Sequence, residues 1–247
     1  PIAAAFDYES QISREELVLV VDIGGGTSDF ALVRLDPQRA ARPDRKDDIL
    51  ASGGVHIGGT DFDKHLSLAG VMPLLGLGSL LKSGLEMPSS PYFNLATWHT
   101  IHQAYTRKAW ANISELALEA REPAKLKAMQ NLMQQKDGHW LALQVEAAKI
   151  SLSNEPVAML DLSRIGAGSE VTLARPVFDQ AIDELVGRVG QTVQGLLSDA
   201  GLAADAVDTV FFTGGSSGVP LLRQRVGELL PTARRVEGDL FGSIGAV

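Results

Sequence analysis

The chain contains no cysteine, so it has neither a disulfide framework nor a metal site built on thiolates. A cysteine-free composition is common in the reducing cytoplasm, and we expect a cytoplasmic protein. Basic residues are also scarce, since 22 Lys and Arg stand against 30 Asp and Glu and give a formal net charge of -8. Nucleic acids and anionic membranes are bound through basic patches, so we expect neither as a partner.

Long hydrophobic runs are missing as well. The most apolar stretch, residues 66–81, is interrupted by one proline and three glycines and is shorter than the ~20 residues that a membrane-spanning helix needs. Hydrophobic residues still make up 45% of the chain, which is enough for the core of one large or two small α/β domains. The first residue is proline rather than methionine, and we therefore expect a piece of a longer protein.

The apolar pattern is that of an α/β protein. Residues 36–48 are polar and are expected to form an exposed hairpin loop between two strands. Residues 70–91 are rich in Gly, Pro and Ser and receive no assignment. Short apolar runs with the length of strands cover residues 17–23, 28–35, 49–55, 158–162, 170–173 and 207–213.

Helical spacing is clearest in residues 178–197, where apolar residues recur at i, i+4, i+7 and i+8, and Gly201 follows as a helix terminator. Residues 105–152 also have a helical pattern, with interruptions near Pro123 and at residues 136–139. Aromatic residues make up only 6% of the chain, and the three tryptophans are expected in the core: Trp98, Trp110 and Trp140.

The stretch "VVDIGGGTSDFALVRL", residues 20–35, places three glycines between two strand-like runs. A dinucleotide-binding glycine loop would lead into a helix and would need a further glycine, so that interpretation is disfavoured. As a hairpin with Gly24–Thr27 as its loop, the stretch pairs Ile23 with Ser28 and Asp22 with Asp29.

Carboxylates directly opposite each other on two strands destabilise the pair, and a divalent cation removes this penalty. The glycines would let backbone N–H groups approach an anion and would tolerate positive φ. A loop of N–H donors beside two acids is typical of a site for magnesium and a nucleoside triphosphate. The alternative is a glycine-rich turn with two solvated aspartates.

Two further glycine pairs each follow a predicted strand. In "GGVHIGGTDFDKHL", residues 53–66, Gly58 and Gly59 precede a helix that would begin with Thr60 and Asp63 in the spacing of a capping box. Glycines at the start of a helix offer free N–H groups to an anion.

The second pair, Gly214 and Gly215, lies in "VDTVFFTGGSSGVPLLRQRV", residues 207–226. Either of the two serines that follow would cap the next helix, with Pro220 in its first turn. Three glycine loops at strand ends favour one nucleotide-binding site over three unrelated turns.

These segments, in this order, resemble the ATPase domain of the Hsp70 family within the actin-like superfamily. Residues 20–35 are similar to its second phosphate-binding segment, residues 53–66 to the loop that follows, and residues 207–226 to its adenosine segment. "VEAAKISLS", residues 145–153, resembles the helix that contacts adenosine. Residues 70–141 diverge, but "MPLLGLG" and "AREPAKL" within them are most similar to the short YegD-type branch of bacterial chaperone-like proteins.

The resemblance implies an α/β fold, the C-terminal lobe of a ribonuclease-H-like (actin-like) ATPase, with a mixed sheet, flanking helices and an inserted α/β subdomain. The core subdomain would be residues 1–57 with 183–247, and the inserted one residues 58–182. The whole protein would be a chaperone that binds Mg-ATP and hydrolyses it slowly to ADP. Its partners would be its own N-terminal lobe, protein clients and co-chaperones.

The resemblance also implies a role for each matching residue. Thr27 would lie near the attacking water as the catalytic residue, and Asp22 and Asp29 would orient magnesium through water. The phosphates would be held by Gly24, Gly25, Gly26, Thr27, Gly58 and Gly59. The nucleoside would be held by Glu146, Lys149, Ser153, Gly214, Gly215, Ser216 and Asp239.

The first three nucleoside residues lie at i, i+3 and i+7 and so share one helix face. The alternative for Glu146 and Lys149 is a solvated pair on a surface helix. Ile150 and Gly218 stand where Hsp70 proteins have two arginines around adenine, and each lost arginine removes on the order of 1 kcal/mol of cation–π attraction.

The first phosphate loop, the catalytic glutamate and the catalytic lysine of the family would fall outside these residues. We therefore expect no ATP hydrolysis by this chain alone. Three other functions remain open for the whole protein. They are a small-molecule kinase of the same superfamily, a degenerate nucleotide-binding scaffold without turnover, and filament formation of the actin type.

Overall fold

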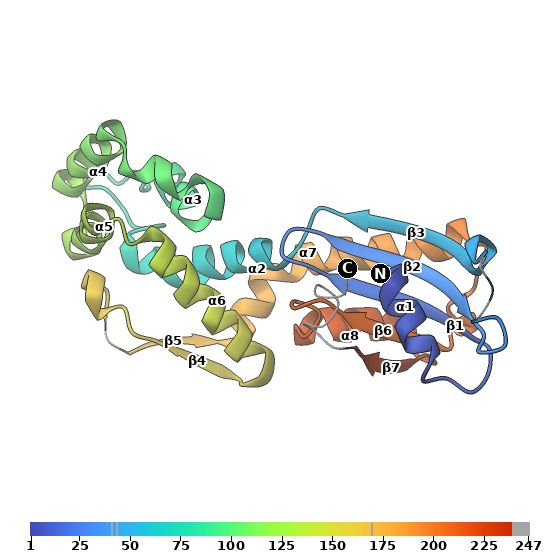
Figure 1. The fold of residues 1–247 in the computed structure, drawn as a ribbon. Coiled ribbons are helices and arrows are strands. Elements are labelled where there is room, and N and C mark those ends of the chain that lie inside the picture. The colour runs from blue at the N-terminus through green and yellow to red at the C-terminus, as the bar shows by residue number, and fades with distance from the viewer. Residues whose placement is uncertain (41, 43, 169, 239–247) are drawn as a thin grey trace. The chain divides into compact units, whose positions relative to one another are not determined.

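The computed structural model describes residues 1–40, 42, 44–168 and 170–238 (Figure 1). The chain divides into two compact units, Pro1–Gly59 with Asp183–Val247, and Thr60–Ile182, and each is described by itself. None of the helices in the described residues has the length and apolar character needed to cross a membrane.

The first unit is built on a mixed five-stranded sheet with the order β3-β2-β1-β6-β7. The pairs β1–β2 and β2–β3 are antiparallel, whereas β1–β6 and β6–β7 are parallel. The expectation of a mixed sheet with flanking helices is confirmed. The strands are β1 (Glu16–Ile23), β2 (Ser28–Leu35), β3 (Ile49–Val55), β6 (Thr209–Thr213) and β7 (Arg234–Glu237).

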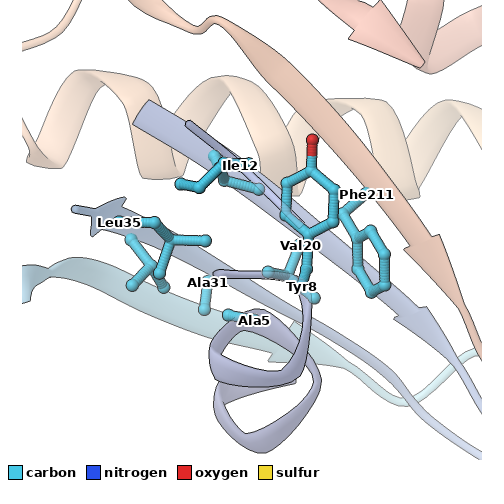
Figure 2. Close-up of a cluster of buried hydrophobic side chains, with 9 residues drawn as sticks. Ala5, Tyr8, Ile12, Val20, Ala31, Leu35 and Phe211 are labelled. Carbon is cyan, nitrogen blue, oxygen red and sulfur yellow. The ribbon is translucent and has the colours of Figure 1, made fainter. Parts of the chain in front are cut away.

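Apolar side chains on both faces of the central strands are buried, as expected for a sheet that helices cover. On one face, α1 (Ile2–Glu9) packs against β1 and β2, and Tyr8 stacks on Phe211 at 5.0 Å between ring centroids. Figure 2 shows this cluster gathered over the strands. On the other face, a β-carbon placed on Gly53 of β3 would lie 2.9 Å from Leu196 of α7.

The helix predicted for residues 178–197 is confirmed as α7 (Arg175–Asp199). Gly201 follows it with φ +63°, the left-handed conformation that ends many helices. The first unit also contains α8 (Pro220–Leu229) and η6 (Ala204–Ala206), where η denotes a short 3-10 or π helix.

The expectation of an exposed loop at residues 36–48 is wrong for its last part. There η1 (Lys46–Asp48) carries a buried aspartate, and the Asp48 carboxylate pairs with Arg39 and Arg45. Arg45 also donates to both carboxylate oxygens of Glu9 on α1, at 2.7 and 3.0 Å. These charges are buried because each finds an opposite charge within hydrogen-bond distance.

The second unit is mainly helical. The predicted interruptions near Pro123 and at residues 136–139 are confirmed as the ends of three successive helices, α4 (Arg107–Glu119), α5 (Pro123–Gln135) and α6 (Gly138–Asn154). The two predicted strands form an antiparallel hairpin of β4 (Val157–Leu160) and β5 (Val171–Ala174). The remaining elements are α2 (Gly59–Leu66), η2 (Ser67–Val71), η3 (Met72–Leu75), α3 (Ser90–Ala96), η4 (Trp98–Tyr105) and η5 (Ser163–Ile165).

Replacing Glu9 tests the buried ion cluster. Glu9→Ala removes the acceptor for Arg45 and for the Asp36 N–H, so we expect the free energy of unfolding to fall by about 3 kcal/mol. Urea denaturation measures this loss. The control is Glu15→Ala, because Glu15 is exposed and pairs with Arg34 at 3.5 Å, and we expect a loss of about 1 kcal/mol or less. Equal losses would contradict the role of the cluster.

Candidate functional site

The hairpin loop joins β1 and β2 in the predicted register, with Ile23 opposite Ser28 and Asp22 opposite Asp29. The Gly24 N–H donates to the Thr27 carbonyl at 2.9 Å. None of the three glycines has the left-handed φ that we expected them to tolerate. A β-carbon on Gly25 or Gly26 would meet no protein atom within 4 Å, so the glycines leave open space beside the loop.

The second glycine pair packs directly on this loop. The Gly59 N–H donates to the Gly24 carbonyl at 2.9 Å, and a β-carbon on Gly58 would lie 2.6 Å from backbone atoms of Gly25. Only glycine fits at Gly58 without moving that backbone. The helix α2 begins at Gly59, one residue before Thr60, at which it was expected to begin.

The third glycine segment approaches the same strand end. Gly214 has φ +83°, and a β-carbon on it would lie 2.5 Å from the Ile23 carbonyl oxygen and 2.6 Å from Asp22 Oδ1. The Ser216 N–H donates to the Ile23 carbonyl at 3.2 Å. The structure thus brings the three glycine segments together at the end of β1.

The serines after this segment do not cap α8, contrary to expectation. Val219 is the N-cap and makes no side-chain cap bond, while the Ser217 hydroxyl donates to the Gly214 carbonyl at 2.8 Å. Pro220 does occupy the first turn, as predicted. The serine therefore stabilises the glycine turn instead of the helix.

Oxygen atoms gather beside the hairpin loop. Asp22 and Asp29 lie opposite each other, and the Thr27 hydroxyl donates to Asp29 Oδ2 at 3.0 Å. No group of three or more His, Cys, Asp or Glu residues suited to a metal ion occurs in the part of the chain that the structure describes. Two carboxylates still suit magnesium, which prefers oxygen ligands and keeps several of its waters.

The predicted nucleoside residues of the second unit lie on α6. Glu146 is exposed and Ser153 is half-buried, while Lys149 is buried. The Lys149 ammonium lies 2.9 Å from Asp63 Oδ1 and 3.0 Å from Oδ2. The alternative of a solvated surface pair is therefore wrong for Lys149. The remaining predicted residue, Asp239, lies outside the described residues.

Sequence reasoning missed a pocket of about 230 Å³ next to these residues. Trp98 lines it and is 49% exposed, so its expected place in the core is wrong, as it is for Trp110, which is 40% exposed. No local pattern connects Trp98 with α6, which follows about 40 residues later. The lining residues are Thr60, Asp63, Ala96, Trp98, Ala142 and Glu146.

The charge state of Asp63 reflects its position in this pocket. Burial raises the pKa of Asp63 to about 6, because a charged carboxylate loses hydration there. The Lys149 ammonium opposes this shift and the Glu146 carboxylate adds to it. At neutral pH, Asp63 is therefore mostly ionised and paired with Lys149.

Comparisons with known proteins give one family. The family model described as "Hsp70 protein" matches residues 116–246, about half of the chain. The chain is similar to chaperone protein dnaK of Cyanidioschyzon merolae, with 27% identity over all of this chain and 33% of that protein. It is also similar to chaperone protein HscA of Shigella boydii and of Yersinia enterocolitica, with 29% and 30% identity over all of this chain and 30% of each relative. The chain thus spans about a third of the length of these relatives.

A β-carbon at position 58 tests the contact between the glycine segments. Gly58→Ala forces the backbone at Gly25 to move, so we expect the free energy of unfolding to fall by about 2 kcal/mol. Gly26→Ala is the matched control, because its β-carbon meets open space, and we expect a change within about 0.5 kcal/mol. Urea denaturation of both variants measures the difference. A fully stable Gly58→Ala variant would contradict the close packing.

The raised pKa of Asp63 predicts a pH dependence of stability. The folded chain binds this proton more tightly than the unfolded chain, whose carboxyl keeps the ordinary pKa of 3.8. The contribution is therefore fully present below pH 3.8 and is lost as the pH rises through about 6. We expect the stability of the wild type relative to Asp63→Asn to fall between these pH values. Parallel pH profiles for the two proteins would show that burial does not raise this pKa.

Proposed function

Because the chain belongs to the Hsp70 family, we propose that it is the C-terminal lobe of an Hsp70-type nucleotide-binding domain with the ribonuclease-H-like, actin-like fold. In this proposal the unit Pro1–Gly59 with Asp183–Val247 is the core subdomain, and Thr60–Ile182 is the inserted one. The segments "MPLLGLG" and "AREPAKL" support a place near the YegD-type branch.

The observation that carries the proposal is the convergence of three glycine segments at the end of β1. Gly25 and Gly26 border open space, and Gly58 packs against their backbone. Glycines have no β-carbon and so let an anion approach the backbone closely, which would suit the β- and γ-phosphates of ATP. Gly24–Thr27 with Gly58 and Gly59 would hold these phosphates.

Asp22 and Asp29 would hold magnesium through its waters, and the ion would neutralise charge on the phosphates. The Thr27 hydroxyl, fixed by its hydrogen bond to Asp29, would orient a water toward the γ-phosphate. Orientation of a nucleophile in this way lowers the barrier without any covalent role for the protein.

The residues proposed for the nucleoside lie on α6 and in the adenosine segment. Glu146 would accept hydrogen bonds from ribose hydroxyls, with Lys149 and Ser153 beside it on α6. The Asp63 carboxylate holds the Lys149 ammonium and so fixes the orientation of that side chain. The adenosine segment would contribute Gly214, Gly215, Ser216 and Asp239.

The whole protein would act as a chaperone, the activity that the names of its relatives give for those proteins. Its partners would be its N-terminal lobe, client proteins and co-chaperones. The resemblance implies that the family's other catalytic groups fall outside these 247 residues, and we propose that this chain alone binds phosphates but does not turn ATP over.

Gly26→Ala separates binding from stability. Its β-carbon fits the fold but enters the space assigned to the phosphates, so we expect the Kd for Mg-ATP to rise about tenfold in calorimetry on the whole gene product. The control is Gly195→Ala on α7. Its β-carbon also meets no protein atom within 4 Å, and Gly195 is far in sequence from the three glycine segments. An unchanged Kd in Gly26→Ala would remove the phosphate assignment.

Phosphate release from the same protein tests the reaction. We expect slow release of phosphate from Mg-ATP by the whole gene product without any added acceptor, and none by the 247-residue chain. Release that requires a sugar or acid acceptor would identify a small-molecule kinase instead. ATP binding without release by the whole gene product would identify a scaffold, and robust turnover by the 247-residue chain would show that its catalytic groups are complete.

A further inference from the structure

The pocket of about 230 Å³ beside Glu146 contains an aromatic side chain, Trp98, to which no role has been given so far. We propose that Trp98 extends the ribose subsite assigned to Glu146 into this pocket and is the surface on which the sugar ring packs. The proposal rests on the proposed function, since it takes Glu146 as a ribose contact. It goes further by assigning a binding role to a residue from the divergent stretch 70–141.

Two helices, α2 and α6, contribute four of the residues that line the pocket. On α6, the residues His139, Ala142, Glu146 and Lys149 follow each other at three- and four-residue intervals and so share one face. Across from them, α2 supplies Thr60 and Asp63 to the pocket. The ion pair between Lys149 and Asp63 joins the two helices beside it.

Trp98 lies at the start of η4 and is held against α6. Its ring makes an edge contact with His139 of α6, at 4.9 Å between centroids and 83° between planes. Nearly half of the side chain is still exposed. A large aromatic surface that is held in place and left open beside a pocket is suited to cover a ligand.

The chemistry of the lining matches a sugar ring. A ribose has an apolar C–H surface, which packs on an aromatic ring, and vicinal hydroxyl groups, which donate to a carboxylate. Trp98 supplies the aromatic ring, Glu146 supplies the exposed carboxylate, and Thr60 supplies a further hydroxyl.

Charge and size argue against other ligands. None of the residues that line the pocket is basic, so a phosphate group has no counter-charge there. The Asp63 carboxylate is already paired with the Lys149 ammonium. A small cation in the pocket would therefore have Glu146 as its main carboxylate ligand, and one carboxylate makes a weak cation site. The volume of about 230 Å³ is below that of typical whole-ligand pockets and suits one ring of a nucleoside.

The first test compares nucleotide with inorganic tripolyphosphate on the whole gene product. In Trp98→Ala we expect the Kd for Mg-ATP to rise about tenfold, equivalent to about 1.4 kcal/mol, while the Kd for Mg-tripolyphosphate stays unchanged. A general loss of structure would weaken both. Trp98→Phe keeps an aromatic ring and is expected to recover part of the ATP affinity. Trp110→Ala is the matched control, because Trp110 is similarly exposed but does not line this pocket.

The second test uses Trp98 as its own reporter. In the double variant Trp110→Phe with Trp140→Phe, Trp98 is the one tryptophan left in these 247 residues. Any tryptophan elsewhere in the gene product is subtracted with the matching Trp98→Phe protein. We expect Mg-ATP to change the Trp98 emission at the concentrations at which it binds, and tripolyphosphate to leave it unchanged.

The outcomes separate this inference from the proposed function. If the wild type binds Mg-ATP but neither the affinity nor the emission depends on Trp98, the ribose subsite is wrong and the ATP-binding assignment stands. If the wild type binds tripolyphosphate and not ATP, both assignments of a nucleoside site fail. A selective loss of ATP affinity in Trp98→Ala supports the subsite.

Discussion

The first unit depends on close backbone contact at the end of β1. There the hairpin loop, the Gly58–Gly59 segment and the Gly214 segment approach each other within distances that admit no β-carbon. Glycine is required at Gly58 and Gly214 because backbone atoms of the hairpin loop and of Ile23 in β1 occupy the place of a side chain. The same arrangement leaves open space at the positions that β-carbons of Gly25 and Gly26 would occupy.

Buried ion pairs provide a second constraint, and each of them fixes one element to another. Glu9 and Arg45 connect α1 to the segment before β3, and Lys149 connects α6 to Asp63 on α2. A buried charge is tolerated only with a partner, so each pair disfavours any packing in which the partners separate. In the second unit this places the Glu146 face of α6 beside the pocket that Trp98 lines.

The features predicted correctly from sequence were local ones. The hairpin register followed from the length of the loop between Ile23 and Ser28, and α7 followed from its apolar period. The strand β7 was missed because it has four residues, three of them charged, and pairs at a sheet edge. The serine caps were predicted wrongly because Ser217 finds a backbone acceptor within its own turn.

The sequence by itself determined the three glycine segments, the opposed aspartates and the resemblance to the Hsp70 family, because these depend on residue type and short spacing. Only the tertiary structure decided that the segments meet at the end of β1, that Lys149 pairs with Asp63, and that Trp98 shares a pocket with Glu146. Turn geometry and helical period act over a few residues and can be read in order along the chain. Contacts between distant residues arise only when the packed core offsets the entropy of closing the long loops between them.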